Sequence, residues 1–323
     1  MAAYLLVNFG GPRETQEIEP FLRELFCDRD VIRSKFPKWL HNWFFERVAK
    51  KRALKIRKDY ERIGFSPIYE DTEAMKRAFE QASDSPVFTF HRYLPATHAE
   101  ALLRIEKCSD PEIRVVPFFP QFCYGTTGSI ARFFSEKLSL LAAQKLRWIK
   151  SYASHLSFIG AWQKRIARFL VERNLDDNDT FLFFSAHGVP QTFIDEGDPY
   201  KEECERSFSK VMEGFPNIPG RLAYQSKFGR GEWLRPYTDE ECKNALSWTK
   251  GRKQIVFVPI SFTSDHIETL FEIEELYLPL IRSNGLHAHR CPALNLDLEW
   301  ISALQTIAKQ TDLSSNQALI RKN

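Results

Sequence analysis

The feature that most constrains the fold is a series of short, continuously apolar segments, each separated from the next by a helical pattern. A strand with one solvated face alternates apolar and polar residues, whereas continuous apolarity is typical of strands buried on both faces of a parallel sheet. We predict strands at 4–9, 87–93, 113–119, 180–185, 221–225 and 255–262. Helical patterns occupy 17–26, 72–83, 129–144, 162–173, 202–213, 239–249 and 268–280. This alternation predicts an α/β fold of doubly wound parallel sheets.

The order of these elements occurs twice along the chain. Residues 5–12 (LLVNFGGP) resemble residues 182–190 (LFFSAHGVP), and residues 115–128 (VVPFFPQFCYGTTG) resemble residues 255–269 (IVFVPISFTSDHIET). Two similar domains would place both sets of carboxyl strand ends around one cleft, where open α/β sheets bind ligands. Generic similarity between any two buried strands is the alternative explanation of the repeat.

Composition excludes several classes of protein. The chain has 323 residues, of which 43% are hydrophobic and 27% charged, as in an ordinary globular protein. Its net charge of +3 gives no argument for nucleic-acid binding. Six scattered cysteines without a CxxC pair indicate reduced thiols rather than a disulfide framework or a zinc site. No stretch approaches the roughly 20 uninterrupted apolar residues of a membrane span, and we expect no signal peptide.

A basic and aromatic block at 31–66 has no counterpart in the second half. Its basic residues are Arg33, Lys35, Lys38, Arg47, Lys50, Lys51, Arg52, Lys55, Arg57, Lys58 and Arg62, and its aromatic residues include Phe36, Trp39, Trp43, Phe44 and Phe45. Aromatic residues at helical spacing beside a basic face suit an interfacial helix, or the mouth of a pocket for an apolar ligand with acidic groups. The alternative is a solvated basic helix that packs its aromatic residues inward.

Two segments contain the residues best suited to chemistry. A helix that begins near Asp265 would place Glu268 and Glu272 on one face, and His266 with Glu268 would offer a nitrogen and an oxygen ligand or a pair of proton acceptors. The alternative is a capping box formed by Asp265 and Glu268. In the other segment, His187 follows a buried strand and is expected where the sheet ends, either in a site or in a purely structural role.

These motifs together resemble the ferrochelatase family. The matching segments are NFGGP, KRALKIRKDYERIGFSPI, FHRY, PQFCYGTTGS, FSAHGVP, GDPY, YQSKFG, WLRPYTDE, PISFTSDHIETLFEIEELY and RCPALN, in the family's order across residues 3–310. The resemblance implies two Rossmann-like domains, 1–152 and 153–323, with the active-site cleft between them. It also implies an enzyme that inserts ferrous iron into protoporphyrin IX to form protohaem and releases two protons.

The resemblance further assigns residues to roles. His187 and Glu268 match the catalytic pair, and Glu272 joins them as a metal-path residue; a neutral imidazole could accept a pyrrole proton or bind iron near pH 7. Leu276 stands where many relatives have a further acid. The positions that match porphyrin contacts are Arg52, Lys55, Tyr60, Ser66, Tyr93, Ser226 and Trp233.

Further expectations concern cofactors, partners and location. The chain ends at Asn323 without the cysteine-rich tail of animal relatives, so we expect no [2Fe–2S] cluster, no prosthetic group and a monomer. We expect a cytoplasmic enzyme with peripheral membrane contact through Trp39, Trp43, Phe44 and Phe45. The alternatives are a chelatase for coproporphyrin III or another tetrapyrrole or metal, and a non-catalytic haem or metal carrier. A nucleotide-binding dehydrogenase is disfavoured because no GxGxxG follows a strand.

Overall fold

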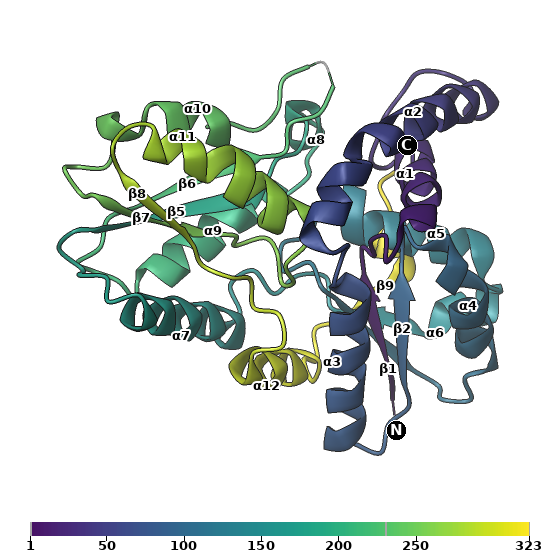
Figure 1. Cartoon of the computed structure of the whole chain (residues 1–323). Coiled ribbons are helices and arrows are strands. Elements are labelled where there is room, and N and C mark those ends of the chain that lie inside the picture. Colours follow the sequence, from purple (N-terminus) through teal and green to yellow (C-terminus); the bar gives the residue numbers. More distant parts are fainter. Residues whose placement is uncertain (1, 230, 323) are drawn as a thin grey trace. The chain divides into compact units, whose positions relative to one another are not determined.

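The structure, a computed structural model, describes residues 2–229 and 231–322, and the chain divides into two compact units (Figure 1). Unit 1 comprises Met1–Ser151 with Ala308–Asn323, and unit 2 comprises Tyr152–Ile307. The predicted division placed residues 308–323 in the second domain, and the structure corrects this. Leu319 is fully buried in the core of unit 1, and the Asn316 side chain accepts a hydrogen bond from Trp148 Nε1 at 2.9 Å.

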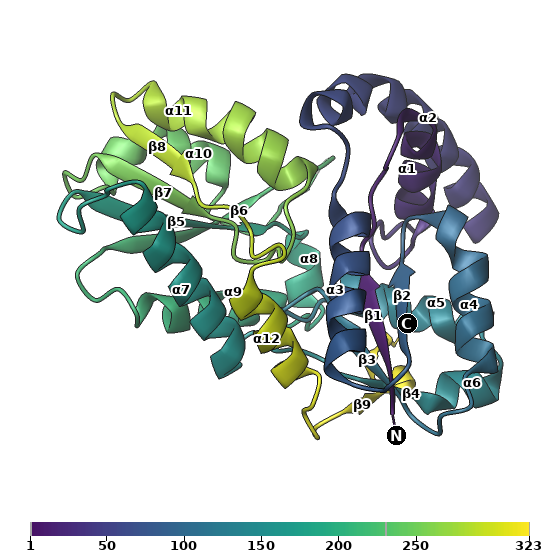
Figure 2. The same cartoon turned by 60° about the horizontal axis from the view of Figure 1, so that its bottom comes forward.

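Unit 1 is built on a sheet with strand order β2-β1-β3-β4-β9, in which β9 alone is antiparallel. Its strands are β1 (Ala3–Asn8), β2 (Val87–His91), β3 (Ile113–Pro117), β4 (Leu146–Trp148) and β9 (Ser314–Ser315). Its helices are η1 (Thr15–Glu17), α1 (Ile18–Cys27), α2 (Lys38–Ile63), α3 (Ile68–Ala82), η2 (Pro95–Thr97), α4 (His98–Lys107), η3 (Tyr124–Gly128), α5 (Ser129–Lys137), α6 (Leu140–Lys145) and η6 (Asn316–Leu319). Within this unit α3 lies on one side of the strands, and α4, α5 and α6 lie on the other (Figure 2).

Unit 2 is built on a parallel sheet with strand order β6-β5-β7-β8. Its strands are β5 (Thr180–His187), β6 (Gly220–Gln225), β7 (Gln254–Val258) and β8 (His287–Arg290). Its helices are α7 (Leu156–Glu172), α8 (Gln191–Asp195), α9 (Tyr200–Met212), α10 (Thr238–Lys243), η4 (Ala245–Ser247), η5 (Glu268–Tyr277), α11 (Leu278–Arg282) and α12 (Leu298–Ile307).

The central strand of unit 2 shows why the strand segments are continuously apolar. Phe183 packs with Trp248 on one face of the sheet, whereas Phe184 contacts Phe208 of α9 on the other. Burial of such a side chain stabilises the fold by about 1.5–3 kcal/mol relative to its exposure. Both faces of β5 are therefore covered, as the apolar pattern predicted.

The two units share one topology, which favours a true structural repeat. In each unit the first strand lies between the second and the third, and the fourth pairs with the third. The third strand also leads in each unit to a π-helix, η3 after β3 and η5 after β7. The predicted α/β fold of two Rossmann-like domains with parallel sheets flanked by helices is confirmed, while the cleft between them stays a prediction.

The structure differs from the predicted elements in several places, and the differences at 129–144, β4 and β8 have a clear local reason. The single helix expected at 129–144 is two helices, because α5 ends at Lys137 and Ser139 Oγ accepts the Ala142 N–H to begin α6. The short strand β4 and the polar edge strand β8 lacked the apolar pattern used to find strands. None of the helices among the described residues has the length and apolarity to cross a membrane.

Candidate functional site

His187 is the last residue of β5, and its ring stands at the carboxyl edge of the sheet in unit 2. The next residue, Gly188, has no room for a side chain, because an added Cβ would lie 2.8 Å from the Gln225 carbonyl oxygen and 3.4 Å from the Trp233 ring. Trp233 therefore packs beside the end of β5. The missing Cβ allows the main chain after the histidine to approach Gln225 and Trp233 closely.

Two histidines of unit 2 face one carboxylate, that of Glu268. Glu268 Oε1 lies 3.4 Å from His187 Nε2, and Glu268 Oε2 lies 3.3 Å from His266 Nε2. The other ring nitrogen of His187, Nδ1, lies 2.5 Å from the Gly188 carbonyl oxygen. A carbonyl oxygen only accepts hydrogen bonds, so Nδ1 carries a proton. The structure thus brings the predicted pair, His187 and Glu268, into direct contact.

The segment with Glu268 is a π-helix that begins two residues after His266. Its last hydrogen bond runs from the Leu278 N–H to the Ile273 carbonyl, a spacing of five residues. Such segments occur frequently at functional sites. The capping-box alternative is wrong: η5 has no side-chain cap, and the Asp265 carboxylate instead accepts hydrogen bonds from Arg290 and Asn295, each at 2.8 Å.

Glu272 follows Glu268 on the same side of η5 and is not a simple solvated residue. Its Oε2 accepts hydrogen bonds from Ser226 Oγ at 2.5 Å and from Gln225 Nε2 and Tyr277 Oη at 3.3 Å. Gln225 Nε2 also donates to the Glu268 carbonyl at 2.8 Å. Three donors around one carboxylate hold it in place next to the histidine and glutamate pair.

The predicted metal ligands do not form one coordination group. Across residues 2–229 and 231–322, no group of three or more His, Cys, Asp or Glu side chains is arranged to hold a metal ion. His187 and Glu268 nevertheless present one nitrogen and one oxygen toward each other, a mixed donor pair suited to a divalent first-row metal.

The charges of this cluster depend on burial and on each other. Burial disfavours the charged form of His187, but the Glu268 carboxylate outweighs burial and raises the pKa of His187 to about 9. Burial also opposes the charge on Glu268, yet His187 and His266 hold its pKa well below the usual range. Burial and the neighbouring Glu268 raise the pKa of Glu272. The contact with Glu268 thus favours the imidazolium form of His187 near pH 7, whereas the sequence predicted a neutral imidazole.

We expect the His187 imidazole to titrate near pH 9 in histidine-labelled NMR spectra, with its signal assigned by its loss in His187→Ala. Glu268→Gln should move this pKa down toward the usual 6.5, because the amide cannot stabilise the imidazolium. Because folding raises the pKa of His187, its pairing with Glu268 stabilises the folded state fully below pH 6.5. This stabilisation is lost as the pH rises through about 9. A His187 pKa near 6.5 in the unsubstituted protein would contradict the pairing.

The predicted porphyrin contacts of unit 1 differ in accessibility. Arg52 and Lys55 are exposed on α2, whereas Tyr60, Ser66 and Tyr93 are almost fully buried. The Tyr93 hydroxyl donates to Asp28 Oδ2 at 2.9 Å. The porphyrin contacts of these five residues stay predictions.

Asp28 organises a buried polar network that the sequence did not indicate. Its carboxylate accepts hydrogen bonds from Arg92 Nη2 at 2.8 Å, from Tyr93 Oη and from Ser129 Oγ. The Arg92 guanidinium also lies over the Phe133 ring, 4.7 Å from its centroid. One carboxylate thus joins the end of α1 to β2 and to the start of α5.

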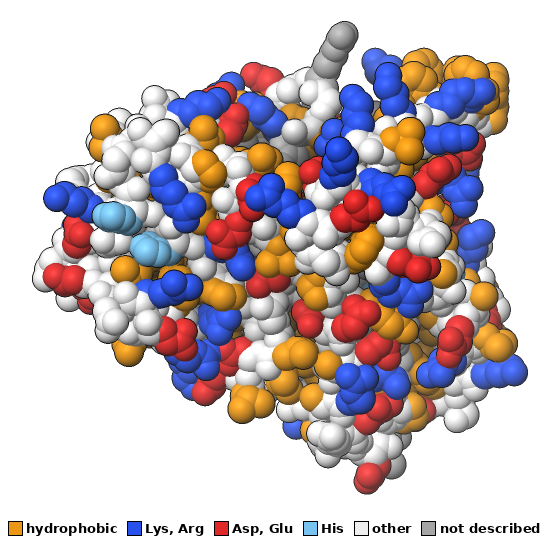
Figure 3. Space-filling view, viewed as in Figure 1, with side chains coloured by type: hydrophobic (Ala, Val, Ile, Leu, Met, Phe, Trp, Pro, Cys, Tyr) orange, Lys and Arg blue, Asp and Glu red, His pale blue; other side chains and the backbone are white. Residues whose placement is uncertain are grey.

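The aromatic residues of α2 face outward. Trp39, Trp43 and Phe44 are 71%, 50% and 46% exposed, whereas Phe45 is partly buried against His41. The buried face of α2 consists instead of Ala49, Ala53, Ile56 and Tyr60. Figure 3 shows hydrophobic and basic side chains intermingled over α2 at the upper right. The alternative of a solvated helix with inward-packed aromatic residues is therefore wrong.

Sequence reasoning missed Gln225 and Tyr277 as members of the site. Gln225 ends a predicted strand, next to Ser226, so its place at the carboxyl edge of the sheet could have been inferred. Ser185 Oγ donates to Gln225 Oε1 at 2.7 Å and thereby turns the amide nitrogen toward η5. Tyr277 could not have been found, because only the π-helical spacing brings its hydroxyl to Glu272.

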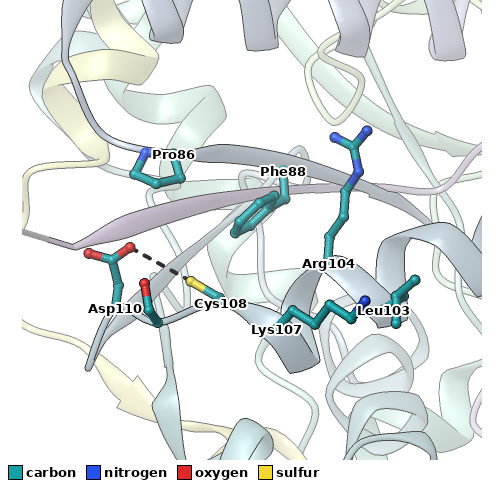
Figure 4. Close-up of a pocket in the computed structure, with 8 residues that line it drawn as sticks. Pro86, Phe88, Leu103, Arg104, Lys107, Cys108 and Asp110 are labelled. Atoms are coloured by element: carbon teal, nitrogen blue, oxygen red, sulfur yellow. Dashed lines mark hydrogen bonds between the residues drawn. The ribbon is translucent and has the colours of Figure 1, made fainter.

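A separate surface pocket in unit 1 contains none of the predicted site residues. It is lined by Pro86, Phe88, Leu103, Arg104, Lys107, Cys108, Ser109 and Asp110 (Figure 4). Its thiol, Cys108, donates to Asp110 Oδ2 at 3.8 Å. We assign no role to this pocket.

Comparisons with known proteins identify the family. The sequence model of the family described as ferrochelatase matches residues 1–312. The chain is 42% identical to a ferrochelatase of Chlamydia caviae and to one of Chlamydia abortus, each over 99% of both chains. Two solved structures share the fold: SirB from Bacillus subtilis with Fe³⁺ (TM-score 0.54, 11% identity, 96% of this chain and 95% of that one) and CbiX, described as the terminal enzyme of sirohaem biosynthesis in denitrifying bacteria (TM-score 0.51, 12% identity, 96% and 100%). With this match over nearly its whole length, the chain belongs to the ferrochelatase family.

Proposed function

We propose that this metal chelatase, a lyase of haem synthesis, inserts ferrous iron into protoporphyrin IX and releases two protons. Membership of the family establishes iron insertion into a porphyrin. The observation that best supports the site is the contact of Glu268 with both His187 and His266 beside the half-buried Glu272. The choice of protoporphyrin, the residue roles and the partners below are part of the proposal.

The chemistry needs a metal ligand and a proton acceptor in one place. Two pyrrole N–H protons must leave the macrocycle as Fe²⁺ enters it, and a ligand must be deprotonated before it binds a metal. His187 starts as an imidazolium, so Fe²⁺ at this position displaces its proton, while Glu268 is already anionic. Glu272, with its raised pKa, is the nearby carboxylate best able to take up protons one at a time and pass them to solvent, so that the imidazolium proton and the two pyrrole protons leave the site.

Iron insertion measured anaerobically by absorbance tests this function. We expect turnover with protoporphyrin IX, and slower turnover with coproporphyrin III, because exposed apolar residues of α2 suit a substrate with two rather than four carboxylates. Faster turnover with coproporphyrin III would reverse the substrate assignment. Binding of porphyrin or haem without any metal insertion would favour the carrier.

We expect replacement of both Arg52 and Lys55 by alanine to raise the KM for protoporphyrin at least about tenfold and to change kcat little. Both side chains are exposed on α2, and Arg and Lys bind carboxylates such as propionates by charge-assisted hydrogen bonds. With the dimethyl ester of the porphyrin as substrate, the double variant and the wild type should have the same KM. Lys50→Ala with Lys51→Ala, which removes equal charge from the same helix, is the matched control. An equal rise of KM in both double variants would show that the net charge of α2, rather than these two positions, causes the effect.

We propose that α2 also contacts the membrane surface through Trp39, Trp43 and Phe44, flanked by its lysines and arginines. We expect the protein to bind vesicles with anionic lipid, and Trp39→Ala with Trp43→Ala to weaken binding by on the order of tenfold, because each indole buries apolar surface at the interface. Vesicle sedimentation measures this. The exposed leucines of α6, replaced in Leu140→Ala with Leu141→Ala, provide a control outside α2. Equal binding by the wild type and the tryptophan variant would exclude this contact.

A further inference from the structure

We infer that Tyr200 and Ser261 are positioning residues that hold the main chain of His187. This inference rests on the proposed function, since it assigns a role to residues that act through His187. Tyr200 is the first residue of α9, and Ser261 lies in the segment between β7 and η5. The two residues therefore come from different parts of unit 2 and meet at one peptide segment.

The main chain of His187 lies beyond the end of its neighbouring strand. The register of β5 and β7 ends with Phe184 opposite Val258, whereas β5 continues beside β6 until His187 stands opposite Gln225. The next residue, Gly188, donates its N–H to the Gln225 carbonyl at 2.8 Å. Successive residues of a strand direct their polar groups to opposite sides, so the N–H and C=O of His187 face the side where β7 has ended.

Two side chains replace the missing strand. The His187 N–H donates to Ser261 Oγ at 2.9 Å, and the Tyr200 hydroxyl donates to the His187 carbonyl oxygen at 3.0 Å. Tyr200 is buried, with 6% of its surface exposed, so its hydroxyl is held by its surroundings. Both polar groups of one residue are thus fixed by side chains rather than by a sheet ladder.

This arrangement controls the position of the imidazole. His187 Nδ1 is already held by the adjacent Gly188 carbonyl at 2.5 Å, so the ring moves with the main chain. The opposite nitrogen lies 3.4 Å from Glu268 Oε1, longer than a typical N–H···O hydrogen bond. A displacement of about 1 Å in a reacting group can cost on the order of 10²-fold in rate. Loss of either hydroxyl is therefore expected to affect turnover more than binding.

The test uses two single-atom deletions in the full chain. Tyr200→Phe and Ser261→Ala should each lower kcat by about tenfold while the KM for porphyrin stays within about twofold, because the substrate-binding residues are unchanged. Ser261→Thr, which keeps the hydroxyl oxygen, should restore at least about half of wild-type kcat, a result that a purely structural role of a small side chain would not produce.

Tyr224→Phe is the matched control. Tyr224 is a buried tyrosine of β6, and its hydroxyl has no hydrogen-bond partner among the residues that the structure describes. We expect its removal to leave kcat unchanged. Thermal unfolding of each variant separates a local effect from loss of the fold, and if Tyr200→Phe does not fold, the alanine and threonine variants at Ser261 decide.

The outcomes distinguish this inference from the proposed function. Wild-type kcat in both Tyr200→Phe and Ser261→Ala would overturn the inference, and so would a rise of KM alone. If His187→Ala is inactive in the same assay, the proposed function still stands. A wild-type protein that inserts no iron would overturn the function itself. Equal losses in Tyr200→Phe and Tyr224→Phe would show that any buried hydroxyl has this effect, and would also overturn the inference.

Discussion

Replacement of His187 by alanine is expected to lower the turnover of iron insertion by on the order of 10²-fold or more, as does loss of a general base or a ligand to the reacting metal. The imidazole is 35% exposed at the end of β5 and faces Glu268, so its removal takes away chemistry and little packing. Anaerobic turnover measures the effect, and circular dichroism and thermal unfolding report on the fold. Turnover close to that of the wild type would remove His187 from the site.

Glu272→Gln provides the comparison within the same cluster. The amide keeps the shape of the side chain but removes its charge, so we expect a higher KM for Fe²⁺, a smaller loss of turnover than in His187→Ala, and an unchanged KM for porphyrin. Iron kinetics identical to the wild type would limit Glu272 to holding Ser226 and Tyr277 in place.

Replacement of Asp28 by alanine is expected to lower the free energy of unfolding of unit 1 by about 3–5 kcal/mol, the usual cost of removing one partner of a buried ion pair. The carboxylate is the acceptor for Arg92, Tyr93 and Ser129, and all four residues are buried. Without it the Arg92 guanidinium keeps Glu24, at 3.5 Å, as its ion-pair partner among the described residues. Arg92 Nη2 and the hydroxyls of Tyr93 and Ser129 would then lose their buried anionic acceptor.

Urea unfolding measures the loss of unfolding free energy in Asp28→Ala. Because a chain of two units need not unfold in one step, hydrogen exchange at the amides of β2 assigns this loss to unit 1. Glu100→Ala is the matched control: Glu100 pairs with Arg104 on the surface of the same unit, and such pairs contribute about 0–1 kcal/mol. A loss below about 1 kcal/mol for Asp28→Ala would show that the network does not stabilise the fold.

Much of the fold followed from local patterns. Continuous apolarity identified β1, β2, β3, β5, β6 and β7, since burial on both faces leaves no room for polar alternation. The same criterion missed β8, whose sequence HAHR is polar because it forms an edge of the sheet. The domain bounds taken from the family resemblance extended unit 2 to the end of the chain, because nothing local in residues 308–323 shows that Leu319 packs into the core of unit 1.

The sequence by itself determined the α/β class, the repeat, the family, and the presence of His187 and Glu268 at the end of a strand and the start of a helix. These properties can be inferred from apolar periodicity and short motifs, because such patterns extend over only a few residues of the sequence. The tertiary structure decided the rest, namely the contact of His187 with Glu268, the hydrogen bonds of Glu272, the outward face of Trp39 and Trp43, and the support of His187 by Tyr200 and Ser261. The physical reason is that charge and hydrogen bonding depend on which distant segments come within about 3–4 Å in a partly dehydrated environment, where Coulomb interactions are strong. A pattern along the chain cannot specify such distances.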